Sequence, residues 1–273
     1  MRWGVRSSTG DNHGTAALCM REISRCLSES VGPAFVTFLG DRYGYRPFPA
    51  VIPADELDAM LAWISSSGSD EDKAALPALK QWFRLDENMV PRSYILQPVS
   101  TFLPDFISKD RSKQQAAGAQ WWPLFEQMQA ALRHASATLP DTVPDGASQA
   151  IAPRLKYHIS VTNEEVIHGL LHNRARKQQA LAILRSIDDM NWDTYNYIQE
   201  KEKGRAVKGY ADWAEDGTID KEAFQLQLKL KEQVAAAGLH AKHVHKYGVP
   251  VATQLRALTS SDYCMHLRAF ADK

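Results

Sequence analysis

The sequence has little of what membrane, disulfide-bonded or nucleic-acid-binding proteins need. Its 3 cysteines in 273 residues are too few for a disulfide framework. No apolar run approaches the ~20 residues that a membrane-spanning helix requires, and no signal-peptide pattern is present. With 32 basic and 32 acidic residues the formal net charge is zero, which argues against a surface for nucleic acid or anionic lipid. We therefore expect a cytoplasmic protein that binds neither.

Sequence motifs for nucleotide and metal chemistry are also missing. No G-x-x-x-x-G-K-[ST] occurs, so the chain cannot itself be a P-loop NTPase, and neither G-x-G-x-x-G after a strand nor G-x-S-x-G is found. Asp212 to Ala223 resembles an EF-hand loop, but Ala214 and Ala223 replace two of the required ligands. His168 and His172 are four residues apart without a matching cysteine or carboxylate. We expect no cofactor and no metal.

The most informative stretch runs from residue 19 to residue 49. Its first part has apolar residues at helical spacing, which predicts a helix with one covered face: Cys19, Ile23, Cys26 and Leu27. Two cysteines so placed would be ~10 Å apart, too far for a disulfide, and are expected to be buried thiols in a reducing compartment. Gly32 and Pro33 end the helix, and residues 35 to 39 then predict a buried strand of a parallel sheet.

An aromatic and basic loop follows this strand. Its candidate interaction residues are Arg42, Tyr43, Tyr45 and Arg46. The loop would lie at the carboxyl edge of the sheet, where binding sites collect in open α/β folds. Two interpretations stay open, namely an exposed contact loop and a turn whose tyrosines pack on the end of the sheet.

The rest of the chain predicts one interrupted α/β domain. Residues 1–69 and 156–273 would be its two parts, and residues 70–155 a mostly helical insertion with a Pro-rich linker. The further elements expected are a helix opened by residues 53–56, an extended run within 92–103, a long helix through 122–135, a capping box at 162–165, a buried strand at 180–187, a helix at 220–237, a last strand at 242–249 and a closing helix at 261–270.

Several blocks carry a resemblance to a known family. The segment CMREI…GPAFV.FLGDRYGYRP, with MRWGVR at the start, resembles the N-terminal domain that precedes the NACHT module in NACHT and WD-repeat proteins. Further matches follow in order: LDENMVPRSYILQPVS (85 to 100), SVTNEEVIHGLL (160 to 171), LAILRSIDDMN (181 to 191) and HKYGVP (245 to 250). The resemblance covers nearly the whole chain.

The resemblance implies a non-enzymatic regulatory or protein-interaction domain of a STAND-type signalling NTPase. Its partners would be other proteins or the downstream NACHT and WD modules, with oligomerisation through the parent protein. In the family MRWGVR is the second strand, so the first strand would be missing and the chain a fragment. If Met1 is instead the true start, the fold has rearranged.

The expected architecture is a three-layer α/β domain with a flavodoxin- or TIR-like parallel sheet. Some TIR-like and deoxyribosyltransferase-like domains cleave the glycosidic bond of NAD with one carboxylate, which gives an alternative, enzymatic function. Glu56 is the candidate by its position after the strand, and Glu22 is second. The structural alternative is that Glu56 complements a helix N-terminus and Glu22 faces solvent.

Overall fold

The computed structural model describes residues 10–142, 151–172, 179–187, 191–202, 208–237 and 244–249. The chain divides into two compact units, of which unit 1 comprises Met1–Glu22 with Arg46–Val161, and unit 2 comprises Ile23–Tyr45 with Thr162–Lys273. Each unit therefore joins segments that are far apart in the sequence. The sequence-based boundaries after residues 69 and 155 do not coincide with this division.

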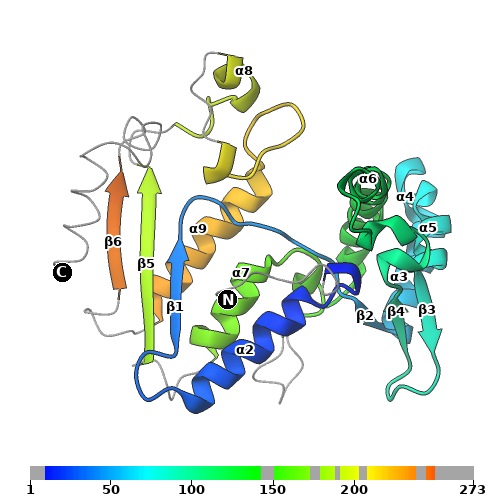
Figure 1. The fold of residues 1–273 in the computed structure, drawn as a ribbon, viewed down its shortest axis with the longest axis horizontal. Coiled ribbons are helices and arrows are strands. Elements are labelled where there is room, and N and C mark those ends of the chain that lie inside the picture. The colour runs from blue at the N-terminus through cyan, green and yellow to red at the C-terminus, as the bar shows by residue number, and fades with distance from the viewer. Residues whose placement is uncertain are drawn as a thin grey trace. The chain divides into compact units, whose positions relative to one another are not determined.

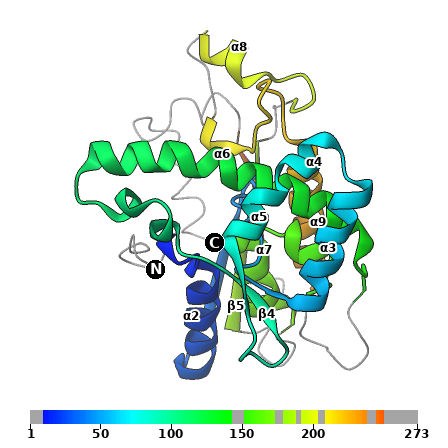
Figure 2. The same ribbon diagram turned by 90° about the vertical axis from the view of Figure 1, so that its right-hand side faces the viewer.

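Unit 1 combines helices with a small antiparallel sheet (Figures 1 and 2). Its longer helices are α3 (Ala54–Ser67), α4 (Asp70–Ala74), α5 (Leu76–Trp82) and α6 (Arg111–Ala135). Its strands are β2 (Val51–Pro53), β3 (Phe83–Asp86) and β4 (Ser93–Leu96), paired in the order β2-β4-β3. Short 3-10 turns complete it: η1 (Val99–Thr101), η2 (Pro104–Ile107), η3 (Ser136–Thr138) and η4 (Leu155–Tyr157).

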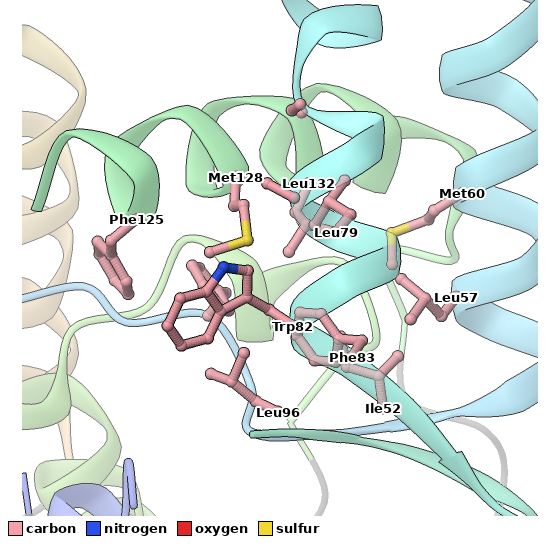
Figure 3. Close-up of a cluster of buried hydrophobic side chains, with 14 of the residues drawn as sticks. Ile52, Leu57, Met60, Leu79, Trp82, Phe83, Leu96, Phe125, Met128 and Leu132 are labelled. Carbon is pink, nitrogen blue, oxygen red and sulfur yellow. The ribbon is translucent and has the colours of Figure 1, made fainter. Parts of the chain in front are cut away.

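The core of unit 1 lies where α3, α5 and α6 meet this sheet. The apolar stripe of α3 is fully buried, because Leu57, Met60 and Ile64 recur at helical spacing on one face. Trp82, at the end of α5, lies among the core side chains contributed by the sheet and by α6 (Figure 3). The helix predicted through 122–135 begins earlier, at Arg111, where the Asp110 side chain accepts N–H bonds from the first turn.

A buried carboxylate joins α4 to α6. Asp72 forms a reciprocal capping box with Ser69, and its Oδ1 lies 2.8 Å from His134 Nδ1. Burial alone would raise the pKa of Asp72, but hydrogen bonds from His134 and Ser69 outweigh it and hold that pKa below its ordinary value. The ionised form is therefore favoured in the folded protein.

We predict that the Asp72 carboxylate makes the stability of unit 1 depend on pH in the acidic range. A depressed pKa means that the contribution is present above the unfolded value of about 3.9 and is lost as pH falls through the lower folded value. Asp72→Asn should lower the free energy of unfolding by about 1 kcal/mol at pH 7 and flatten its decline below about pH 4. Urea unfolding from pH 7 to pH 2 measures this. Asp70→Asn, at an exposed position of the same helix, should behave as wild type.

Unit 2 is built on a parallel sheet of three strands. These are β1 (Phe35–Leu39), β5 (Ala180–Ile187) and β6 (Val244–Val249), in the order β1-β5-β6 (Figure 1). Its helices are α7 (Val161–Val166), which continues as a π-helix (Ile167–Leu171), then α8 (Tyr197–Glu202), the 3-10 turn η7 (Lys208–Tyr210) and α9 (Lys221–Ala236). The strands predicted at 35–39, 180–187 and 242–249 are confirmed, as is the helix at 220–237.

One face of the parallel sheet carries the main core of unit 2. Leu39 and Leu184 from the strands pack with Leu170 from the π-helix and with Leu230 and Val234 from α9. The opposite face is open at β1, where Val36 and Phe38 are exposed. Among the described residues the chain is therefore a mixed α/β structure with a small parallel sheet. The second helical layer of the predicted three-layer arrangement does not cover β1.

Helix α2 (Thr15–Glu29) precedes β1 and crosses from unit 1 into unit 2. The expectation that its apolar face is covered was wrong, because none of its residues is buried. Cys26 is exposed and Cys19 half-buried, so neither is a core thiol. None of the helices in the described ranges is long and apolar enough to cross a membrane. The strand predicted at 1–6 and the helix predicted at 261–270 lie outside those ranges.

Candidate functional site

The carboxyl end of β1 is fixed by a buried carboxylate. Asp41, two residues after the strand, accepts a hydrogen bond from Lys231 Nζ at 2.8 Å and one from the Ile187 amide at 3.2 Å. Lys231, on α9, also donates to the carbonyl of Arg185 at 2.7 Å. Asp41 is buried, and the Lys231 side chain is only 15% exposed. The network ties the loop to the ends of β1 and β5 and to the helix that covers them.

Close packing continues at the residue before Asp41. Gln227 of α9 donates its side-chain amide to the Gly40 carbonyl at 2.6 Å. A Cβ at Gly40 would approach Arg185 Nη2 to 2.7 Å, so a side chain at this position would require the end of the Arg185 side chain to shift. The guanidinium of Arg185 in turn lies 5.1 Å from the centre of the Tyr210 ring. The start of the loop is thus enclosed by charged and aromatic groups.

The middle of the loop is held by Asp212. Its Oδ2 accepts the amide N–H groups of Tyr43 at 2.7 Å and Gly44 at 3.0 Å, and its Oδ1 lies 3.2 Å from Arg42 Nε. Gly44 has a φ of 97°, in the left-handed region that only glycine adopts without strain. One carboxylate therefore fixes two backbone amides and one cation, as an anion does in a turn-shaped nest.

The four predicted contact residues have different surroundings. Tyr43 is 1% exposed, and its hydroxyl accepts a hydrogen bond from Asn163 Nδ2 at 2.8 Å. By contrast, the Arg42 side chain is 56% exposed and Tyr45 is 49% exposed. Arg46 is the first residue of the second segment of unit 1, where its carbonyl accepts from Arg133 Nη2 at 3.3 Å. Of the two interpretations left open by the sequence, Tyr43 follows the one in which a tyrosine packs on the end of the sheet, whereas Arg42 and Tyr45 are exposed.

Glu56 belongs to unit 1, whereas the parallel sheet belongs to unit 2. Glu56 lies on α3, where Lys156 Nζ contacts its Oε2 at 2.6 Å and the Tyr157 hydroxyl donates to its Oε1. Burial, together with the Glu56 carboxylate, raises the pKa of Tyr157 above its ordinary value. Both carboxylate oxygens are therefore engaged in holding η4 to the start of α3.

The other candidate residues taken from the sequence do not form a single cluster with the loop after β1. Glu22 is half-buried on α2 in unit 1, and His168 and His172 lie at the π-helix of unit 2. Burial, together with the neighbouring His172, lowers the pKa of His168. No group of three potential metal ligands occurs among the described residues. Asp212, first residue of the EF-hand-like stretch, is committed to the loop amides.

Sequence reasoning missed the role of Asp212. The residue follows Tyr43 of the loop by 169 positions and has no local pattern that distinguishes it from other turn aspartates.

Sequence reasoning also missed that the aromatic residues around Asp212 form a small core. Trp192 and Ile219 are buried in a cluster that Trp213 packs against. Spacing of Trp and Tyr in a charged segment is the only sequence signal for this cluster.

The chain was compared with known proteins. No family model matches, and no solved structure matches. NACHT domain- and WD repeat-containing protein 1 of Mus musculus is 30% identical over 244 residues, and that of Homo sapiens is 30% identical over 241 residues. These alignments cover 87% and 86% of this chain and 13% of each relative. NACHT and WD repeat domain-containing protein 2 of Homo sapiens is 34% identical over 101 residues, 37% of this chain and 6% of that protein.

The chain spans only about an eighth of the length of the curated relatives that match most of it. The NACHT domain and WD repeats in these names therefore describe the relatives. The match nevertheless extends through both units and includes the loop after β1 within the aligned share. Over most of its own length, this chain is a homologue of the NACHT and WD repeat-containing proteins.

Proposed function

We propose that this chain is a non-enzymatic regulatory domain of a NACHT and WD-repeat signalling protein, and that its loop after β1 contacts a protein partner. The observation that carries the proposal is the display of Arg42 and Tyr45 on a loop whose backbone is locked by Asp212. Arginine and tyrosine are the residue types that dominate binding hot spots. A loop fixed before binding loses little conformational entropy on association.

The chemistry of the loop favours a protein over a small molecule or a nucleic acid. A cation and an aromatic ring at the surface suit a carboxylate or a backbone carbonyl next to an apolar side chain. The chain has no net charge that would attract a polyanion. The partner would be another protein or the NACHT or WD module of the parent protein, as the names of the relatives suggest.

We predict that the double variant Arg42→Ala/Tyr45→Ala loses partner binding by about 10- to 100-fold, because two hot-spot side chains are removed. Quantitative pull-down with the intact chain, followed by titration of the captured partner or of a purified NACHT or WD-repeat module, measures the loss. Asp212→Ala should also weaken binding, since it frees the loop without removing either contact side chain.

The matched control is Arg25→Ala/Val31→Ala, which removes a cation and an apolar side chain that are also exposed in unit 2. It should bind as wild type does. If the loop variant retains the full set of partners at unchanged affinity, the loop is not the contact. Each variant should keep its fold, because both replaced side chains project from the surface. Circular dichroism of each variant checks this.

A further inference from the structure

The outer edge of β1 lacks a partner strand among the described residues. In that part of the chain β1 pairs with β5 alone and lies at one margin of the sheet (Figure 1). The Ala34 amide, just before the strand, donates to Gln179 on the β5 side. Every second residue of β1 directs its backbone N–H and C=O groups to the outer edge.

In the described part of the chain this edge is apolar and carries neither charge nor proline within the strand. Phe38 is 69% exposed and Val36 is 44% exposed, whereas Ile183, the β5 partner of Phe38 on the same face, is buried. The strand reads FVTFL, without a charged residue or a proline. The edges of the other sheet differ, since β3 carries Arg84 and Asp86 and β2 ends in Pro53. Exposed apolar edges without charge or proline are templates for strand pairing.

We infer that two copies of this chain associate by antiparallel pairing of their β1 strands about Thr37. In that register Thr37 pairs with Thr37 of the second copy, and Val36 lies opposite Phe38. The outward backbone groups of the two strands would form the hydrogen bonds, and Val36 of one copy and Phe38 of the other would be directly opposite cross-strand partners. An aromatic side chain opposite a β-branched one is a favourable cross-strand pair.

The strand's own sequence favours a second copy over an unrelated strand. The register is self-complementary, so one two-fold axis satisfies both edges and closes the assembly at two chains. Continuing the register sets Asp41 and Arg42 opposite the uncharged Pro33 and Gly32, so no like charges meet. Pairing of the two short strand edges, with Val36 and Phe38 of each copy, would bury a total surface on the order of several hundred Å². This is below the ~1,200 Å² that stable complexes bury. The dimer is therefore weak, with Kd on the order of 10–100 μM.

The test is the oligomeric state of the intact chain by sedimentation and light scattering between about 1 and 200 μM, a range set to span that Kd. Wild type should shift from monomer to dimer across this range. Phe38→Lys should weaken dimerisation by about tenfold or more, because both symmetric aromatic pairs are lost. Leu85→Lys, an exposed apolar residue on an edge strand of the other sheet, should leave it unchanged.

Three results would overturn the inference. Wild type could remain a monomer throughout, Phe38→Lys could dimerise like wild type, or Leu85→Lys could abolish the dimer equally. The loop variant Arg42→Ala/Tyr45→Ala should dimerise normally, so failure of the proposed contact loop and failure of this edge are distinguishable. Hydrogen exchange of the outward-facing amides of β1 should slow with concentration in wild type but not in Phe38→Lys.

A cysteine pair tests the register. With Cys19, Cys26 and Cys264 changed to serine in every sample, Val36→Cys/Phe38→Cys should give a covalent dimer under mild oxidation. Cα atoms of directly opposite residues in an antiparallel pair are ≈ 4.5–5.5 Å apart, within disulfide reach. Val36→Cys alone should not cross-link, because position 36 faces position 38 of the other copy. Equal cross-linking of the single and double variants would exclude this register.

Discussion

Replacing Asp41 with alanine is expected to lower the free energy of unfolding by about 3–5 kcal/mol, because it leaves a buried ammonium without its counter-ion. Lys231 would retain only the Arg185 carbonyl, 2.7 Å away. The Ile187 amide would lose its acceptor as well. Urea unfolding followed by far-UV circular dichroism measures the loss, and hydrogen exchange should place it in β1, β5 and α9.

The control for Asp41 is an ion pair on the surface of the same unit. Glu29 lies 3.2 Å from Arg25 Nε with both side chains exposed, so Glu29→Ala should cost under about 1 kcal/mol. The double variant Asp41→Ala/Lys231→Met should recover part of the loss, since replacing both buried charges by apolar groups removes the unpaired one. Equal losses for Asp41→Ala and Glu29→Ala would show that the buried pair does not hold the loop.

Two kinds of sequence signal predicted unit 2 well. β1 and β5 are short apolar runs, as strands of a parallel sheet require, although only β5 is buried as expected, since Val36 and Phe38 of β1 are exposed. The α9 segment had an ambiguous period, and its Glu, Lys and Gln content favoured helix, as found. These signals are local. They fix which element forms, whatever it packs against.

The antiparallel sheet of unit 1 could not be predicted in the same way. β2 has three residues, and β3 continues directly from α5 through Phe83, which fits the helical spacing of Leu76 and Leu79. Its strand conformation is set by pairing with β4 rather than by its own pattern. The membership of Glu56 in unit 1 could not be predicted for the same reason, because it required knowing which unit α3 belongs to.

For the candidate site, residue types identified the loop but not its exposed members. Tyr43 and Tyr45 are equivalent by composition, and only the distant groups of unit 2 decide that Tyr43 packs inward while Tyr45 faces out. Asp212 fixes that choice by binding two consecutive amides of the loop. A contact made across such a sequence separation leaves no spacing pattern. The locked loop was therefore visible only in the structure.

The second large effect is expected in unit 1, where Trp82→Ala should cost about 3–5 kcal/mol of unfolding free energy. The Trp82 ring lies 4.7 Å from that of Phe102 in an edge arrangement and 4.6 Å from that of Trp121. It is almost fully buried at the centre of the core (Figure 3). Truncation removes this packing and leaves a cavity that short helices and strands around it can only partly close.

Trp122→Ala is the matched control, because it deletes the same side chain where that side chain is 46% exposed on α6. Its main described ring contact is with Phe125 at 5.8 Å, so its loss should cost about 1 kcal/mol or less. Circular dichroism during urea unfolding reports both variants without depending on tryptophan emission. For Trp82→Ala, hydrogen exchange should accelerate in α3, α5 and α6 and stay unchanged in β5 and α9, because those elements have a separate core. Acceleration of all five elements to the same extent would instead mean that the two cores unfold as one cooperative body.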